Sequence, residues 1–151
     1  MSDLRDLYQE VIFDHYRHPR NCHPLPDATH KAEGYNPLCG DRITLYLKVE
    51  DGVVKEVAFD GAGCAISTAS ASMMTEALKG RPLAEVETLF GRFHEMVTAP
   101  AGEPVRDEAA LGKLAALGGV REFPARVKCA TLAWHTLHAA LHGERDAVST
   151  E

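Results

Sequence analysis

The 151-residue chain lacks several features that mark common classes of protein. No apolar run approaches the roughly 18 residues of a membrane-spanning helix, so we expect no membrane partner. Positive charge is not in excess: 16 basic against 22 acidic residues give a net charge of −6, which disfavours nucleic acid as a partner. The first residues are polar and acidic, unlike a signal or transit peptide, so we expect a cytoplasmic protein.

Close cysteine pairs are also missing. Zinc fingers and ribbons need such pairs because they have no other core to gather their ligands. Here Cys39, Cys64 and Cys129 are far apart, and the fourth cysteine, Cys22, has no partner at ligand spacing. Without a secretion signal, the thiols are expected to be reduced. The three scattered cysteines either share one site that the fold assembles or are small buried apolar residues.

What is present is the composition of an ordinary globular domain, with 45% hydrophobic and 25% charged residues. The sequence contains no internal repeat and no linker. We therefore expect a single domain over residues 1–143, followed by a frayed tail over residues 144–151.

A hairpin is the clearest local pattern. Residues 42–50 alternate between apolar and polar side chains, Asp51-Gly52 is a common tight turn, and residues 53–59 form the return strand. Residues 19–41 contain four prolines and are expected to be mostly loop, with one short strand near residues 28–33.

Helices are expected around this sheet. The spacing of apolar residues predicts them over residues 2–18, 65–77, 84–98, 109–117 and 124–142, the fourth ending at Gly118-Gly119. In the first helix, the stripe predicted to be buried consists of Leu4, Leu7, Tyr8, Val11, Ile12 and Tyr16. The predicted fold class is α+β: a small antiparallel sheet of about three strands with helices packed on one face.

A candidate metal site can be assembled from the cysteines. Asp41 follows Cys39 by two residues, and Gly40 between them allows a sharp turn that would let both side chains converge. Together with Cys64 and Cys129 they make three sulfurs and one carboxylate. Such a set can surround one soft divalent metal, with the oxygen as the most exchangeable ligand. We expect this site to be exposed at one end of the fold, where three loops meet.

The local context of two cysteines is typical of reactive thiols. Cys64 follows a glycine-rich turn and would stand at a helix N-terminus, which favours the thiolate. Arg126 and Lys128 flank Cys129 and are expected to lower its pKa and to contact a partner protein. The alternative for this pair is a solvated basic turn. All three cysteines are expected to be exposed.

Four segments together resemble a known family: LYQEVIFDHYRHPRN, NPLCGDRI, GAGCAISTASASMMTEALKG and FPARVKCATLAW. The chain resembles the iron–sulfur cluster assembly proteins of the IscU/NifU N-terminal family, and most closely those of the SufU type. It departs from the IscU pattern in two ways. Lys128 stands where IscU-type proteins carry histidine, and the interval between the second and third cysteines is longer, much as in SufU-type proteins.

The resemblance implies a zinc-bound sulfur acceptor, with Zn²⁺ held by Cys39, Asp41, Cys64 and Cys129. Its implied partner is a pyridoxal-phosphate cysteine desulfurase of the SufS type, followed by downstream iron–sulfur assembly components. A desulfurase imidazole would replace one cysteine on the metal, and the freed thiolate would attack the desulfurase persulfide. Cys39 is the first candidate for that acceptor and Cys129 the second. The chain would then be a sulfurtransferase-like accessory more than a stand-alone enzyme.

Two other functions stay open. The same four residues could hold iron and build a transient [2Fe–2S] cluster for transfer, or the zinc could be purely structural. Outside this set, we interpret Cys22 as a loop thiol. His135, His138 and His142 are interpreted as a solvated helix face, because no carboxylate is interleaved with them.

Overall fold

A four-stranded sheet in the order β3-β2-β1-β4 forms one layer of the molecule. The computed structural model describes residues 2–37, 40–100, 111–142 and 148–149. The strands are β1 (His30–Asn36), β2 (Asp41–Glu50), β3 (Val53–Ala62) and β4 (Val148–Ser149). The first three are antiparallel neighbours, which confirms the predicted sheet. The sequence did not predict β4, which pairs in parallel with β1. Val148 and Ser149 belong to the tail over residues 144–151 that was predicted to be frayed, but they are paired with β1.

The β2–β3 hairpin follows from the alternation in the sequence. Ile43, Leu45 and Leu47 are buried on one face of β2, as predicted. Asp51 and Gly52 have φ angles of +54° and +73°, the left-handed pair that a tight hairpin turn requires. On the other side of β2, β1 pairs in a register that sets Asn36 opposite Asp41. That register brings the end of β1 to the candidate metal site.

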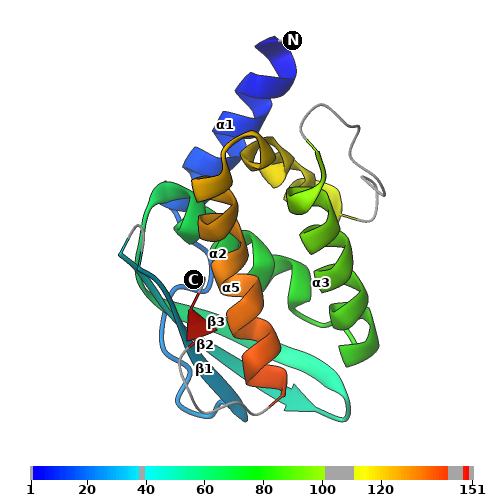
Figure 1. The fold of residues 1–151 in the computed structure, drawn as a ribbon. Coiled ribbons are helices and arrows are strands. Elements are labelled where there is room, and N and C mark those ends of the chain that lie inside the picture. The colour runs from blue at the N-terminus through cyan, green and yellow to red at the C-terminus, as the bar shows by residue number, and fades with distance from the viewer. Residues whose placement is uncertain (1, 38–39, 101–110, 143–147, 150–151) are drawn as a thin grey trace.

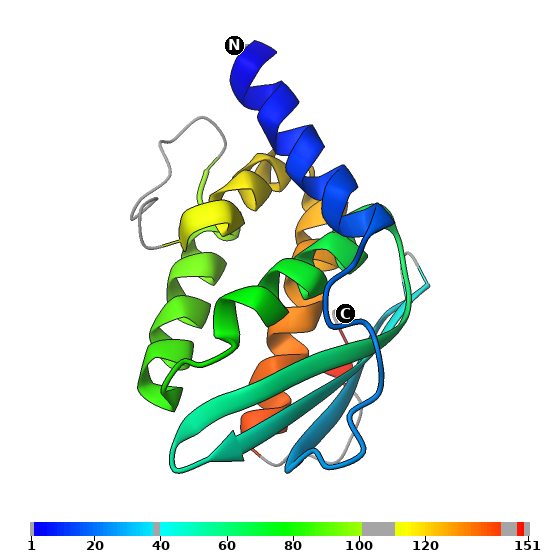
Figure 2. The same ribbon diagram turned by 180° about the vertical axis from the view of Figure 1, so that it is seen from behind.

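Helices cover one face of the sheet, as Figures 1 and 2 show. They are α1 (Ser2–Arg17), α2 (Ala65–Leu78), α3 (Leu83–Thr98) and α5 (Pro124–Leu141), close to the predicted bounds. α5 packs on β1 and β2, while α2 lies between α1 and α5. Among the described residues, no helix combines the length and apolar character that crossing a membrane requires.

A 3₁₀ helix, η1 (Gly112–Glu122), replaces the α-helix predicted over residues 109–117. The predicted end at Gly118-Gly119 is wrong, because the helical run continues to Glu122. The buried apolar residues of η1 and of its N-cap recur at every third position, which matches the three residues per turn of a 3₁₀ helix: Leu111, Leu114, Leu117 and Val120. Residues 101–110, where the predicted helix began, lie outside the described part of the chain.

The buried face of α1 differs from the prediction among the side chains that the structure describes, which exclude Leu4, Leu7 and Tyr8. Ile12 is buried, but Tyr16 is 44% exposed, and His15 takes the inward position instead. His15 Nδ1 lies 2.8 Å from Ser72 Oγ on α2, and burial lowers the pKa of this histidine. Tyr16 was predicted to be buried because tyrosine is more hydrophobic than histidine. His15 is buried instead because its hydrogen bond to Ser72 offsets the cost of burying a polar side chain.

Candidate metal centre

Three of the four predicted ligands lie together at one end of α5. The ligand atoms of Asp41, Cys64 and Cys129 are all within 4.8 Å of one another. Asp41 is the first residue of β2, Cys64 is the N-cap of α2, and Cys129 is in the second turn of α5. The fourth predicted ligand, Cys39, lies outside the described residues. The predicted meeting of three loops is wrong for Cys129, which belongs to a helix.

Asp41 is buried and oriented by its neighbours. Its side chain is 1% exposed, and the backbone N–H of Cys64 donates to Oδ1 at 2.8 Å. Asn36 Nδ2 lies 3.4 Å from Oδ2, and Cys64 Sγ lies 3.9 Å from the same oxygen. A buried carboxylate beside two thiols is costly when all three ionise, because like charges repel in a region that water cannot screen. A cation at this point would remove that cost.

Cys64 has the chemical character of a thiolate. Its pKa is lowered to about 6, first by a hydrogen bond from Cys129 and then, against the opposing effect of burial, by the backbone N–H of Ser67. That N–H lies 3.4 Å from Cys64 Sγ at the N-terminus of α2. The predicted influence of the helix N-terminus is therefore present, but the neighbouring thiol contributes more.

Cys129 is buried, so the prediction of an exposed thiol is wrong at this position. It is 3% exposed, because the face of α5 that carries it also carries Ala130 and Ala133 and packs into the core. The predicted effect of Arg126 and Lys128 on Cys129 stays a prediction. The guanidinium of Arg126 lies over the ring of Phe123, 4.5 Å from its centroid.

Asn36 is a site residue that the sequence reasoning missed. Its side chain is 0% exposed, and its amide nitrogen lies 3.4 Å from Asp41 Oδ2 and 3.5 Å from Cys129 Sγ. One amide therefore contacts two candidate ligands from different elements. Its position at the start of the NPLCGDRI segment was the available signal, but an asparagine before proline usually indicates only a turn.

The donor set fits zinc. Two sulfurs and one carboxylate oxygen, clustered within 4.8 Å and mostly shielded from water, are ligands that zinc accepts, with a fourth position left for Cys39. The hydrogen bonds from Asn36 and from the Cys64 N–H hold the carboxylate in place, as is usual around metal ligands.

Gly63→Ala tests how tightly this site is packed. A Cβ at this position would lie 3.0 Å from Asp41 Oδ1 and 3.2 Å from Ser67 Oγ. We expect the substitution to displace the carboxylate and to lower the free energy of unfolding by about 1–3 kcal/mol, measured by urea denaturation. Gly91→Ala is the matched control, because nothing lies within 4 Å of its added Cβ and alanine favours a helix. Equal stability of the two variants would contradict this packing.

The thiolate of Cys64 predicts a pH dependence in metal-free protein. Alkylation of Cys64 by iodoacetamide should reach half its maximal rate at a pH of about 6, measured by mass spectrometry. The pKa of Cys64 in the folded protein is lower than the value of about 8.5 that a cysteine has in an unfolded chain. The thiolate therefore stabilises the fold fully at pH values above about 8.5. The stabilisation is lost as the pH falls toward 6. Cys22, whose pKa is raised by burial, is the internal control. Identical profiles for the two thiols would contradict the prediction.

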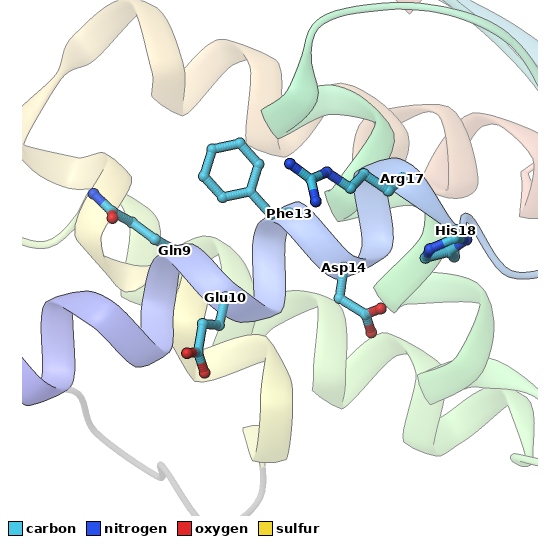
Figure 3. A pocket seen from close by; sticks show the side chains of 6 residues that line it. All are labelled: Gln9, Glu10, Phe13, Asp14, Arg17 and His18. Atoms are coloured by element: carbon cyan, nitrogen blue, oxygen red, sulfur yellow. The ribbon is translucent and has the colours of Figure 1, made fainter.

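A surface depression along α1 is separate from this centre. Figure 3 shows its lining side chains, five from α1 and one from the residue that follows it: Gln9, Glu10, Phe13, Asp14, Arg17 and His18. None of the candidate ligands lines it. Cys22 is also outside the centre, exposed and paired by an isolated bridge with Phe59 of β3, consistent with its interpretation as a loop thiol.

Comparison with known proteins identifies the family. Residues 7–142 match the NifU-like N-terminal domain. The chain belongs to this family. This confirms the resemblance seen in the sequence.

Two curated relatives of this NifU-like chain are similar along nearly their whole length. It is 43% identical to the zinc-dependent sulfurtransferase SufU of Bacillus subtilis, over 95% of both chains. It is 46% identical to the iron–sulfur cluster assembly scaffold protein IscU of Thermotoga maritima, over 89% of this chain and 92% of the relative.

A solved structure confirms the fold. It comes from Fervidobacterium islandicum, is described as an iron–sulfur cluster assembly scaffold for the SUF system, and is 34% identical. It matches with a TM-score of 0.81, over 90% of this chain and 97% of that one.

Proposed function

We propose that this NifU-like protein is a sulfur acceptor in iron–sulfur cluster assembly that holds Zn²⁺ through Cys39, Asp41, Cys64 and Cys129. The observation that carries the proposal is the cluster of three of these ligands within 4.8 Å. The lowered pKa of Cys64, at about 6, supports it because metal ligands and sulfur nucleophiles are thiolates. The similarity to a zinc-dependent sulfurtransferase supports zinc over other metals.

Zinc, when bound, would keep the thiolates deprotonated without taking part in redox chemistry. The protein's own residues prepare the site for this. Asn36 and the Cys64 N–H orient the carboxylate of Asp41, and burial of Asp41 and Cys129 excludes water from one side. Cys64 is only half-buried, which leaves the other side open to a partner.

The sulfur donor we propose is a pyridoxal-phosphate cysteine desulfurase that carries a persulfide. An acceptor thiolate attacks the outer sulfur of that persulfide, and a new S–S bond forms on the acceptor. The S–S bond of the donor breaks, and its cysteine leaves as a thiolate, so no external oxidant or reductant is needed. We propose that an imidazole of the desulfurase takes the place of the acceptor cysteine among the ligands.

Cys39 is the better candidate for the acceptor. Cys129, the second candidate, is 3% exposed and fixed in a helix, so a large partner could reach its sulfur only after local opening of α5. Cys39 is separated from the start of β2 only by Gly40, whose φ of +74° is a conformation that glycine adopts readily.

The exposed N-terminal end of α5 suits a partner protein. Phe123 is 47% exposed, and the guanidinium of Arg126 lies over its ring. Exposed aromatic and arginine side chains are frequent anchors of protein interfaces. We propose that this pair and Lys128 contact the desulfurase.

The test is desulfurase turnover in the presence of each variant, with zinc content measured on the same samples. Wild-type protein should stimulate cysteine turnover. Cys39→Ser should keep the fold and lose the stimulation. Cys22→Ser is the matched control and should behave as wild type, because Cys22 lies outside the centre. Full stimulation by Cys39→Ser would exclude Cys39 as the acceptor.

A scaffold that builds a [2Fe–2S] cluster on the same residues is the second candidate, favoured by the similarity to the Thermotoga maritima IscU. Protein purified without oxygen separates the two. Colourless protein with one zinc per chain supports the acceptor. Visible iron–sulfur absorption, with iron in place of zinc, supports the scaffold.

A further inference from the structure

A second group of potential metal ligands lies where α3 and α5 pack together. The ligand atoms of Glu87, His138 and His142 are all within 4.8 Å of one another. α3 and α5 lie side by side in Figures 1 and 2. His138 is in the last turn of α5, His142 is the C-cap of that helix, and Glu87 comes from α3. The sequence did not suggest this group because its carboxylate is 51 residues from the nearer histidine.

The distances suit a shared ion. His142 Nε2 lies 3.6 Å from Glu87 Oε1, and the rings of His138 and His142 have centroids 4.1 Å apart. Two ligands of a tetrahedral zinc, each about 2.0–2.1 Å from the metal, are roughly 3.4 Å apart. Histidines four residues apart on a helix face the same side, so both imidazoles can approach one ion.

The ring of Phe90 packs against one of these histidines, His138. His138 packs against Phe90, with ring centroids 5.6 Å apart, and Phe90 also contacts His94 and His135. His94 and His135 face each other across the two helices, with centroids 5.8 Å apart. They are not part of the three-residue group. All three members of the group are exposed, so an ion could enter from solvent.

We propose that Glu87, His138 and His142 form a second metal site, which binds a divalent zinc-like transition metal ion. Two imidazoles and one carboxylate are the ligand set of open zinc sites, in which solvent or a substrate takes the remaining position. A set without sulfur favours borderline ions over soft ones.

This site is distinct from the cysteine centre. Cys129 precedes His138 by nine positions in the same helix, which is about 13 Å at 1.5 Å per residue. One ion cannot reach both groups. The proposal therefore does not depend on the function assigned to the cysteines.

Cobalt titration of full-length, tag-free protein tests the site. The cysteine centre is first filled with one equivalent of Zn²⁺, since thiolate ligands in a tetrahedral site select zinc. Added Co²⁺ should then bind as one further equivalent, with visible ligand-field bands and no thiolate-to-cobalt charge transfer. Isothermal titration with Zn²⁺ should show the same extra equivalent.

Matched variants locate the ion. Glu87→Gln should weaken Co²⁺ binding about tenfold, and the double variant His138→Gln with His142→Gln about 100-fold or more. His94→Gln removes an exposed imidazole outside the group and should bind Co²⁺ as wild type does. Unchanged circular dichroism would show that the variants are folded.

Three results would overturn the proposal. The first is that wild-type protein takes no second equivalent of Co²⁺, which would make the group an ordinary histidine–glutamate ion pair. The second is that the double variant binds Co²⁺ as tightly as wild type. The third is that His94→Gln loses as much binding as the double variant, which would indicate non-specific uptake by surface histidines.

Discussion

Cys64→Ser is expected to keep the fold and to lower the zinc affinity of the cysteine centre by about 100-fold or more, because an alcohol replaces a soft thiolate ligand. Serine is itself a favoured N-cap, so its hydroxyl can accept the Ser67 N–H that Cys64 Sγ accepts now. The substitution therefore separates metal binding from folding. Competition with a chromophoric zinc chelator measures the first. Thermal unfolding of the metal-free protein at about pH 5 measures the second, because below the pKa of Cys64, about 6, the thiolate does not contribute to stability.

Cys22→Ser is the control for this experiment. Cys22 is exposed and outside the cluster, so its loss should leave zinc affinity unchanged. Wild-type zinc affinity in Cys64→Ser would mean that Cys64 is not a ligand. A large loss of stability in the metal-free variant at about pH 5, where the thiol is protonated, would instead mean that the sulfur supports the fold through its packing.

Asn36→Ala is the second large effect that we expect. Outer-shell partners of metal ligands typically contribute about 10–100-fold to metal affinity, and this amide contacts both Asp41 and Cys129. Its loss also leaves the buried carboxylate with one donor fewer, so the free energy of unfolding should fall by about 1–3 kcal/mol. Zinc competition and urea denaturation measure the two effects.

Ser70→Ala is a matched control for the loss of a buried hydrogen bond. Ser70 is fully buried, donates to the carbonyl of Ala130 at 2.6 Å and accepts from Trp134 Nε1 at 3.3 Å. It bridges α2 and α5 without contacting a candidate ligand. We expect Ser70→Ala to be destabilised to a similar extent but to keep wild-type zinc affinity. If both variants lose zinc affinity equally, the effect of Asn36 is only a loss of stability.

Local patterns in the sequence were enough to predict most of the elements. The β2–β3 hairpin followed from alternation and from Asp51-Gly52, because both are properties of neighbouring residues. Four helices followed from apolar spacing in the same way. The exception is η1, whose apolar residues repeat every three positions. The α-helical period does not fit this repeat, so the predicted helix ended too early, at residue 117.

The candidate ligands could be chosen from the sequence because their motifs are local and chemically distinctive. Their burial could not. Cys129 was expected at the surface because Arg126 and Lys128 flank it, but which face of α5 points inward depends on packing against α2 and the sheet. Asn36 became a site residue only through the β1–β2 register and the approach of α5.

The amino-acid order therefore contained the secondary structure, the family and the chemical type of the main site, since each depends on short stretches of chain. Three-dimensional packing was needed to reveal the buried amide behind the ligands, the inward turn of Cys129 and the meeting of Glu87 with His138 and His142. These features join residues from separate elements. The distances between these residues depend on how whole helices pack on the sheet, and short stretches of sequence do not determine that packing.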